Sequence, residues 1–539
     1  MKSSSQYTFA QVPTVRAPRS AFDRSHTYKT TLDSGKLVPI EIFDVLPGDS
    51  VNLNLTAFMR LTTPIVPFMD NLKATFFFFY VPLRLVWQNF KRFMGEQDNP
   101  TDSISYLVPQ ITPPSGQGFA IGSLADYFGI RTGIAGISVD ATPFRAYNLI
   151  WNSWFRDENL QNSLTVDMDE TTVDDTNYQV QRRAKVHDYF TSALPWPQKG
   201  PGVELPLGTT APVVGNGLSV GIQTVSTMGS ASKNWVYDSI TGTMMVGNPG
   251  SNGIGVETDP AKSNLVADLS KATAATINSL RTAFQIQHLY EALARGGSRY
   301  NELVLSCFQV QVPDARLQRP EYLGGGTIPI QIHSVAQTSA SNAASATSTS
   351  SDTTPQGTLA AYGLAGGRVG FSKSFVEHGW VIGLVSIDAD ITYQQGIDRM
   401  FLRKTRFDYY WPQLAHLGEA EIFNKQIFCQ GPSVVDANGN IVDDQVFGYQ
   451  ERWAEYRYGV SHITGELRSD APQSLDVWHL AEDFANLPTL SSTFIESNPP
   501  VSRVLAVQNR PQFIYDSLVK MNHVRPMPTY SVPGWADHF

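Results

Sequence analysis

Hydrophobic and polar residues alternate within the segment at 37–61, which predicts two strands joined by a turn. From Val51 to Leu55 every second residue is apolar, the period of a strand with one buried face. Pro47, Gly48 and Asp49 interrupt the segment with residue types that favour a tight turn. The first clear elements of the chain are therefore β-strands.

A run of aromatic residues at 74–81 does not alternate. Its sequence, Ala-Thr-Phe-Phe-Phe-Phe-Tyr-Val, predicts a strand that is covered on both faces and ends at Pro82. Residues 83–94 follow with apolar positions spaced for a short helix, and Gly95 is a typical helix stop.

Two further segments have the period of amphipathic helices. Thr142 and Pro143 favour a helix start, as cap and first helical residue, and apolar residues follow on one face up to Phe155. Residues 277–295 repeat the pattern and end at Gly296-Gly297. Short β-like pieces then occur at 303–312, 328–333, 379–393, 422–428 and 501–507. Many short strands with two helical insertions predict a mainly β chain, a β-sandwich with long excursions.

Composition divides the chain into four parts. Residues 1–36 form a basic arm, in which six Lys or Arg and two Asp give a charge of +4. Residues 37–199 and 271–539 carry the sandwich. Between them, 200–270 is rich in Gly, Thr, Val and Ser and predicts a small β-rich surface insertion. The low-complexity stretch at 338–354 predicts a mobile surface loop.

The overall composition limits the classes of protein that fit. Charged residues make up only 17% of the chain, and the net charge is −9, which fits a chain that hides neutral surface in an assembly. Cys307 and Cys429 are too far apart to indicate a disulfide framework or a structural zinc site. Because no signal peptide follows Lys2 and no apolar run could span a bilayer, we expect synthesis in a cytoplasm.

No catalytic or cofactor motif stands out. Gly324-Gly325-Gly326 lacks the Lys and Ser/Thr of a phosphate loop, so we interpret it as a tight turn. The ten His are scattered, which favours structural roles. Glu419 and Glu421 with Trp411 are residue types of a glycosidase or glycan-binding groove, but their spacing does not support one. We expect no enzyme activity, no cofactor and no bound metal.

Basic residues with flanking aromatics occur at 24–29, 182–190 and 520–525. Cationic side chains combined with aromatic stacking hold single-stranded nucleic acid without reading its sequence. Packing of Arg on aromatic rings within the fold, or at a subunit contact, explains these segments equally well. The residues predicted to face nucleic acid are Lys2, Arg16, Arg19, Arg24, Lys29, Arg182, Arg183 and Lys185.

Two blocks, 408–417 and 447–458, concentrate aromatic residues, Arg and carboxylates without catalytic spacing. Trp, Tyr and Arg are the residues that anchor the buried centre of protein–protein contacts. An aromatic-rich domain core is the other interpretation of the same composition. The residues predicted to lie at a contact between subunits are Tyr409, Tyr410, Trp411, Tyr449, Arg452, Trp453 and Tyr456.

These blocks belong to a longer series of segments that carry a resemblance. The series, in one order along the chain, is 25–31, 44–49, 69–72, 155–160, 187–200, 283–287, 294–297, 313–326, 377–379, 384–386, 392–396, the two blocks and 525–528. It resembles the major capsid proteins of the Microviridae, small phages with circular single-stranded DNA, in their gokushovirus branch. The chain departs from the pattern mainly within 200–270 and 338–354.

The resemblance implies an eight-stranded antiparallel jelly-roll β-sandwich with large loop and helical insertions. It implies a T=1 icosahedral capsid in the virion, enclosing a circular ssDNA genome after synthesis in the cytoplasm of a bacterial host. Further implied partners are a small basic internal DNA-binding protein, an internal scaffolding protein, a DNA pilot protein and a host surface receptor, with a glycan as one option. In this family an insertion forms a spike near the threefold axes, and 200–270 is our candidate for it.

Two features of the chain bear on assembly. A subunit with a net charge of −9 cannot neutralise a packed genome alone, which fits the implied basic internal protein. The Pro-rich segments 499–511 and 526–533 are candidates to extend onto neighbouring subunits.

Two other classes of protein remain open at this point. A glycan-binding β-sandwich adhesin would be monomeric or trimeric and would not form closed particles. A secreted carbohydrate enzyme is disfavoured by the missing signal peptide and the unpaired carboxylates.

Overall fold

The structure, a computed structural model, describes residues 18–203, 277–295, 318–338, 357 and 359–530, together with short strands within 213–267 and 341–354. The chain divides into two compact units. One comprises residues 1–197, 297–305 and 309–539, and the other comprises 198–296 and 306–308.

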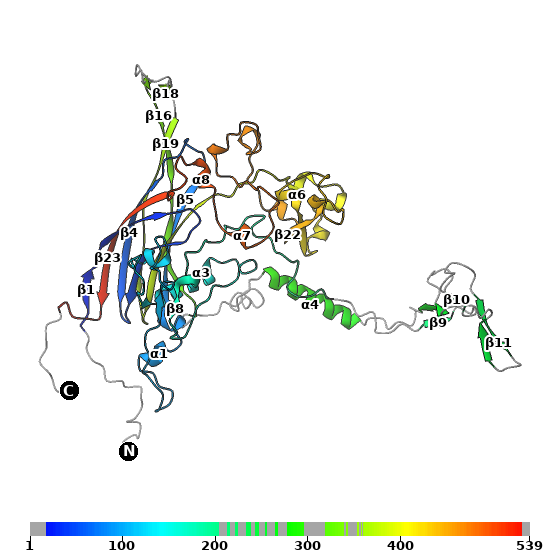
Figure 1. Ribbon diagram of the computed structural model, residues 1–539, viewed down its shortest axis with the longest axis horizontal. Helices are drawn as coiled ribbons and strands as arrows, with labels where there is room; N and C mark the ends of the chain where they lie inside the picture. The colour runs from blue at the N-terminus through cyan, green and yellow to red at the C-terminus, as the bar shows by residue number, and fades with distance from the viewer. Residues whose placement is uncertain are drawn as a thin grey trace. The chain divides into compact units, whose positions relative to one another are not determined.

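Two antiparallel sheets dominate the first unit (Figure 1). The six-stranded sheet has the order β1-β23-β4-β19-β16, with β2 also paired to β23, and the four-stranded sheet has the order β15-β5-β20-β3. Their bounds are Ser20–Asp23 (β1), His26–Leu32 (β2), Val38–Val45 (β3), Ser50–Leu61 (β4), Leu72–Pro82 (β5), Glu321–Pro329 (β15), Gln331–Ala336 (β16), Leu359–Ser374 (β19), Gly379–Ala389 (β20) and Phe513–Arg525 (β23).

The strands alternate between the two sheets in the order of a jelly roll. Along the chain, β2, β4, β19 and β23 belong to one sheet, and β3, β5, β15 and β20 interleave with them in the other. This connectivity joins two Greek keys face to face. The predicted fold class is therefore confirmed, although the sheets hold six and four strands because β1 and β16 extend the first one.

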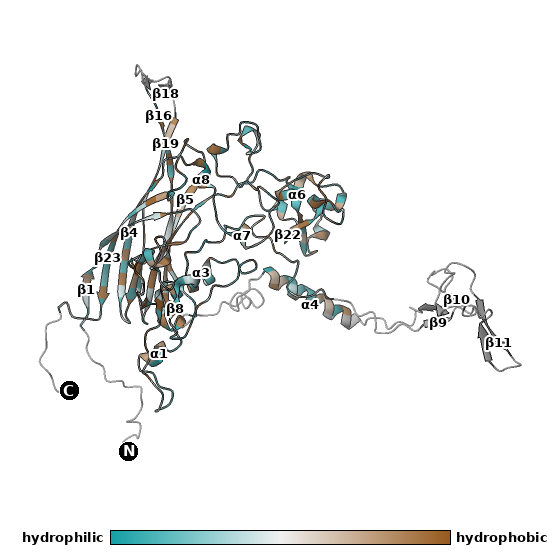
Figure 2. Cartoon of the chain, in the orientation of Figure 1, coloured by the Kyte–Doolittle hydropathy of each residue, from teal (hydrophilic) through white to brown (hydrophobic). Residues whose placement is uncertain are grey.

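The main core lies between the two sheets. In β4 every second residue is buried, from Val51 to Leu61, and β23 repeats the pattern from Phe513 to Met521. Figure 2 shows the resulting alternation of hydrophobic and hydrophilic residues along these strands. The inward residues meet the aromatic run of β5, where Phe76 and Phe78 face the same core. The alternating pattern of the sequence thus predicts this core directly.

The four-stranded sheet is covered on its other face as well. Phe79 and Val81 of β5 pack in a second core with Tyr147 and Trp151 of α3 (Thr142–Trp154). The prediction that the aromatic strand is buried on both faces is therefore confirmed. The opposite face of the sandwich, formed by the six-stranded sheet, carries exposed residues at every second position of β4.

Several predicted local elements differ in the structure. Residues 83–94 form two separate turns, η1 (Leu83–Leu85) and α1 (Phe90–Phe93), rather than one helix. Thr142 is the first residue of α3 and not its cap. Its backbone N–H donates a hydrogen bond to the Asp140 carboxylate at 2.8 Å. The Thr142 hydroxyl instead accepts from the Trp380 indole N–H at 2.8 Å.

The glycine triplet is not a turn. Gly324, Gly325 and Gly326 lie inside β15, opposite the aromatic strand β5. A Cβ at Gly325 would collide with the backbone oxygen of Phe76, and one at Gly326 would come within 2.9 Å of Val369. The glycines allow the strand to approach its neighbours closely, which the tight-turn interpretation missed.

Two C-terminal predictions also need correction. The piece at 501–507 is the short helix α8 (Val501–Val504) followed by irregular chain, not a strand. Within segment 499–511, Val501, Val504 and Leu505 are buried in the main core, whereas 506–511 are exposed, so an extension of the latter onto a neighbouring subunit stays a prediction. At 422–428 the strand β21 (Glu419–Phe423) passes into α6 (Asn424–Ile427). Residues 303–312 lie outside the described residues.

The second unit contains the predicted helix and a set of short strands. The helix α4 spans Ile277–Arg295, the bounds that the periodicity predicts. The strands are β9 (Val213–Gly215), β10 (Gly221–Thr224), β11 (Lys233–Asp238), β12 (Thr243–Val246), β13 (Ile254–Gly255) and β14 (Leu265–Ala267), all paired antiparallel. Within the low-complexity stretch only β17 (Ser341–Asn342) and β18 (Thr353–Thr354) are described, as an antiparallel pair.

The remaining elements of the first unit are short. They are β6 (Gln110–Thr112), α2 (Leu124–Tyr127), β7 (Val139–Asp140), β8 (Val173–Asp174), η2 (Asp175–Asn177), η5 (Arg399–Phe401), η6 (Arg406–Asp408), η7 (Pro412–Leu414), η8 (Val442–Asp444), β22 (Val446–Glu451), η9 (Ala454–Tyr456), η10 (Gly465–Leu467), η11 (Asp476–Trp478) and α7 (Ser492–Ile495). Among the described helices, none has the length and apolar character needed to cross a membrane.

Candidate assembly and nucleic-acid surfaces

The two aromatic blocks come together in a lobe with its own small core. Phe190, Tyr393, Ile422, Phe447 and Phe494 lie within this core. β21 and β22 pair antiparallel, and the Tyr410 ring contacts Trp453 and Tyr456, which brings the two blocks together. The sequence pattern predicted the composition of this region but not which rings face solvent.

The first block is held in place by backbone hydrogen bonds. The Asp408 carboxylate accepts from the backbone N–H of Thr405 at 2.6 Å and of Lys404 at 2.9 Å, which lowers the pKa of the Asp408 carboxyl. The Trp411 indole N–H donates to the Arg406 carbonyl at 2.8 Å. These contacts fix an exposed tryptophan in one orientation, so less side-chain entropy is lost when a partner covers it.

Cationic groups lie over the exposed rings of both blocks. The Arg403 guanidinium lies 5.3 Å from the ring centre of Tyr409 and 4.4 Å from that of Tyr456. Tyr410 packs edge-on against Trp453 at 5.7 Å. Cation–π and edge-to-face geometry of this kind stabilises a preformed aromatic surface.

The predicted contact residues separate by exposure. Tyr409, Tyr410, Trp411 and Tyr456 are each about half exposed, with Trp411 at 47%. Trp453 is 5% exposed and donates its indole N–H to the Leu414 carbonyl, so it supports the surface from beneath. The other two are partly covered: Tyr449 is a strand residue paired with Leu194, and Arg452 lies over the Trp453 ring.

Sequence reasoning missed several exposed apolar residues beside the blocks. Phe401, Phe407 and Tyr458 are about half exposed or more. The signal was present, since 399–407 mixes Arg, Met and Phe in the same way as the blocks that follow. We define the aromatic surface by its exposed members, which are Phe401, Phe407, Tyr409, Tyr410, Trp411, Tyr456 and Tyr458.

A pocket of about 440 Å³ opens beside the aromatic surface. Tyr189, Phe190 and Tyr393 form part of its apolar lining. Gln426 also lines it and accepts from the Tyr189 hydroxyl at 3.1 Å, while its buried side-chain N–H group has no partner among the described residues. The pocket could take a small apolar group with a hydrogen-bond acceptor, but its side chains have no catalytic arrangement.

The described basic residues of the arm lie on the strands β1 and β2 or beside them. Arg19 donates to the Gly48 carbonyl at 2.7 Å and to the Ser50 hydroxyl at 3.2 Å. Arg24 and Lys29 are exposed, Arg24 near the His523 ring and Lys29 paired with Asp516. Lys2 and Arg16 lie outside the described residues.

The second basic segment is used inside the fold. Arg182 donates to the carbonyls of Ser34 at 3.1 Å and Ser497 at 2.9 Å. Arg183 pairs with the buried Asp388 at 3.1 Å. The Lys185 side chain is 8% exposed, and its ammonium pairs with Glu482 at 2.7 Å. These three cations are therefore engaged by their own chain and not available to a DNA phosphate in this arrangement.

Two histidine pairs tie β2 and β23 to neighbouring strands. His26 pairs with the buried Glu41 carboxylate at 3.0 Å, and this hydrogen bond raises the pKa of His26 to about 9. The buried His523 ring lies 2.8 Å from Asp49, but burial outweighs that contact and lowers the pKa of His523. Arg525 donates to the same Asp49 oxygen at 3.0 Å.

Metal ligands do not gather in this fold as far as it is described. Within those residues no group of three or more His, Cys, Asp or Glu side chains is arranged to hold an ion. Cys429 is a free, exposed cysteine, and Cys307 lies outside the described residues.

Comparisons with known proteins agree with the fold. The profile of the family described as "Capsid protein (F protein)" matches residues 10–535. The Capsid protein VP1 of Bdellovibrio phage phiMH2K is 48% identical over 99% of this chain and 98% of its own length. The proteins of the same description from Chlamydia phage 1 and Spiroplasma virus 4 are 43% and 38% identical, each over at least 95% of both chains.

Proposed function

This chain belongs to the phage capsid protein (F protein) family, and we propose that its copies close into a T=1 icosahedral shell around a circular single-stranded DNA genome. It is a structural protein of the virion that assembles with itself, and not an enzyme. A monomeric or trimeric glycan-binding adhesin is not favoured, because the family match spans nearly the whole chain.

The aromatic surface is the observation that carries the assembly proposal. Tyr409, Trp411 and Tyr456 are exposed on one lobe and held rigidly, which matches the anchor residues of subunit contacts. A single contact of this kind is modest, but symmetry repeats it in every subunit, so a closed shell is stable.

The assembly proposal is tested by removing exposed rings while the subunit stays folded. Tyr409→Ser with Trp411→Ser should abolish shell formation, measured by sedimentation of particles from cells that also express the other phage proteins. Ile121→Ser, which removes an exposed apolar side chain outside the proposed contacts, is the control and should assemble normally. Normal particles from the double variant would contradict a contact at this surface.

We infer that the basic arm faces the enclosed DNA. Its charge is +4 in a chain of net charge −9, and Arg19, Arg24 and Lys29 lie on or beside strands at one edge of the six-stranded sheet. Substituting Arg16, Arg19 and Arg24 by Ala should lower the packaged DNA without stopping shell formation. The absorbance ratio of purified particles measures this, and unchanged DNA content would refute the role.

We also propose that residues 200–270, which fall within the second unit, form the host-attachment spike. The described strands of this segment, within 213–267, are short and paired with one another, and they belong to a compact unit of their own. The partner is a receptor on the bacterial surface, and a glycan would fit the neutral, Gly-rich composition of this segment.

The remaining partners follow from charge and from the family resemblance. An acidic subunit leaves most genome phosphates unneutralised, so a small basic internal protein is required. An internal scaffolding protein and a DNA pilot protein complete the proposed set. Synthesis takes place in the cytoplasm of the bacterial host before assembly.

A further inference from the structure

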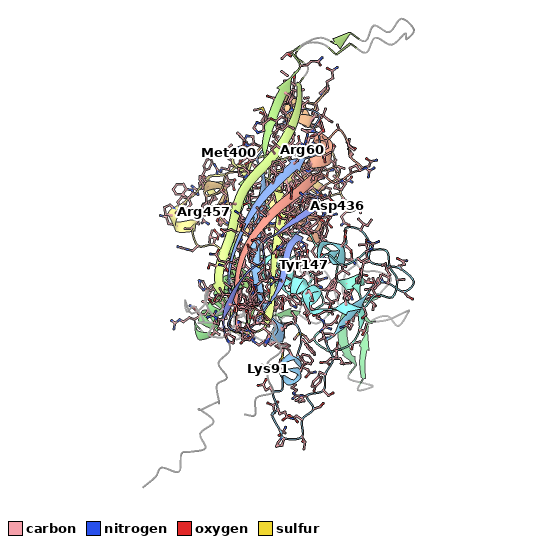
Figure 3. All side chains as sticks on the ribbon, turned by 90° about the vertical axis from the view of Figure 1, so that its left-hand side faces the viewer. Arg60, Lys91, Tyr147, Met400, Asp436 and Arg457 are labelled. Carbon is pink, nitrogen blue, oxygen red and sulfur yellow. The ribbon has the colours of Figure 1, made fainter. Side chains whose placement is uncertain are left out.

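The uncovered face of the six-stranded sheet has a composition unlike the rest of the chain. Figure 3 looks onto this face, with Arg60 labelled among the strands. We define the sheet face by the outward residues of β2, β23, β4 and β19. Its central apolar members are Phe58, Ile514 and Leu518, with Phe58 52% exposed and Ile514 59% exposed. An exposed ring beside two exposed branched side chains forms a small apolar patch of the kind that marks an interaction site.

The register of the strands places cations around that apolar centre. One row across the sheet reads Lys29, Asp516, Phe58 and Gly366, and the next reads Thr27, Leu518, Thr56 and Arg368. Arg60 lies opposite Ile514 on one side, and Lys520 lies opposite Asn54 on the other. Each of the four strands β2, β23, β4 and β19 therefore contributes one basic side chain within a few residues of the row that contains Phe58.

Most of this positive charge is unpaired. Within the described part of the chain, Arg60, Arg368 and Lys520 form no ion pair, and Asp516 is already paired with Lys29. A chain with a net charge of −9 thus concentrates four cations against one carboxylate on this face. The charge is complementary to a polyanion.

A hollow of about 490 Å³ continues the face at its polar end. Lys520, Asn52, Asn54 and Asn522 line it, and the side-chain amides of the three asparagines can donate and accept hydrogen bonds at a base edge. Asp23, the acidic residue of the hollow, accepts from the backbone and hydroxyl of Ser25. Gly366 and Gly370 of β19 have no side chains, so nothing projects from the backbone in that part of the sheet face.

We propose that this sheet face binds single-stranded DNA, with Phe58 stacking on a base and Arg60, Arg368 and Lys520 contacting phosphates. A flat sheet with an exposed ring and flanking cations is a platform for unpaired bases, whose faces stack without sequence preference. The inference rests on the proposal that the shell encloses ssDNA and names the residues that meet it.

Charge argues against two other occupants of the face. A second copy packed on the same face would bring the two sets of cations together, and the few apolar residues of the face, chiefly Phe58, Ile514 and Leu518, would offset little of that repulsion. A basic internal protein would be repelled for the same reason. A polyanion with stacking bases satisfies both the charge and the exposed ring.

The first test measures binding of a fluorescein-labelled oligo(dT) to the full-length unassembled subunit by anisotropy. Phe58→Ala should weaken binding roughly five- to a hundredfold, the range for loss of one base-stacking contact, while Phe58→Tyr should restore it. Met69→Ala removes an exposed apolar side chain outside both proposed surfaces and should bind normally. Equal affinity of Phe58→Ala and the unaltered chain would overturn the stacking contact.

The same assay separates phosphate contacts from stacking. Each phosphate contact contributes roughly 0.7 to the magnitude of the slope of log affinity against log salt concentration. Substituting Arg60, Arg368 and Lys520 by Ala should therefore lower the magnitude of this slope by about 2. The control replaces three exposed cations elsewhere, Lys91, Arg131 and Lys404, and should leave the slope unchanged. An unchanged slope in the sheet-face variant would overturn the proposal. It would also be overturned if this variant lost self-association but kept its affinity for DNA.

Ultraviolet cross-linking of intact particles tests the same face in the assembled state. Peptides from β4 and β23 should carry cross-linked nucleotides, and the Phe58→Ala particles should lose them. DNA-filled particles with cross-links only in other segments would overturn this inference but leave the enclosing role intact. If the unaltered chain forms no DNA-containing particles, the proposed function itself is contradicted.

Discussion

Single glycines determine how closely the strands of this sandwich approach one another. At Gly325 a Cβ would collide with the backbone oxygen of Phe76, which cannot rotate away. At Gly366 the nearest atom to a Cβ would be the Ala57 oxygen at 4.0 Å, an ordinary contact. Both positions are glycines, one in each sheet, but only Gly366 has room for a side chain.

We therefore expect Gly325→Ala to destabilise the subunit by about 1–3 kcal/mol, the typical cost of overpacking. Gly366→Ala is the matched control and should change stability by less than about 0.5 kcal/mol. Urea denaturation of the unassembled subunit measures both. Equal midpoints for the two variants would contradict the close approach of β15 and β5.

The His26–Glu41 pair makes the stability of the subunit depend on pH. Since the pair raises the pKa of His26 to about 9 from 6.5, its contribution is full below about pH 6.5. It falls as the pH rises through 9, because the folded state then loses the proton that held the pair.

His26→Gln should remove this dependence, so the stability difference between variant and unaltered chain should shrink from pH 6 to pH 9.5. Denaturation midpoints at the two pH values test it, with the exposed His416→Gln as a control for loss of an imidazole. A difference that grows with pH would show that the sign is wrong.

At the residue scale, the sequence predicts which residues belong to a contact region better than it predicts which of them are exposed. Trp411 and Trp453 occur in blocks of the same composition, yet one is half exposed and the other is buried. Their difference depends on the pairing of β21 with β22 and on the Leu414 carbonyl that accepts from Trp453. No local pattern encodes those contacts.

At the scale of elements, periodicity predicts the long strands and helices and fails for short apolar runs. The alternation in β4 and the helical spacing of α4 are correct because each extends over several repeats. The piece at 501–507 is too short to distinguish a buried strand from a buried helix, and Val501 and Val504 pack in the core as α8. The jelly-roll class came from the resemblance, and the order of strands within each sheet came only from the structure, since no local pattern specifies it.

The segment at 182–185 shows that a basic run can be a structural element. Arg183→Met should destabilise the subunit by about 2–3 kcal/mol, because Asp388 would stay buried without its cation. Oligo(dT) binding of the folded protein should not change. Arg131→Met, an exposed position, is the control in the same denaturation assay. A large loss of DNA affinity in Arg183→Met with normal stability would show instead that this segment contacts nucleic acid.

At the scale of the whole molecule, the two units have separate proposed tasks. The sandwich unit contains both large sheets and the aromatic surface, while the other unit contains the locally paired strands within 213–267. Deleting residues 215–255 should leave shells intact and abolish adsorption to host cells, measured by particle yield and by binding of purified phage. Loss of assembly in this variant would contradict an attachment role separate from the shell.

The central claim is that this chain builds a closed shell, and electron microscopy of the purified protein tests it most directly. Co-expressed with the other genes of its phage, it should yield uniform icosahedral particles of T=1 symmetry that contain DNA and carry protrusions. Monomers or trimers alone, under conditions that preserve assembly, would contradict the account.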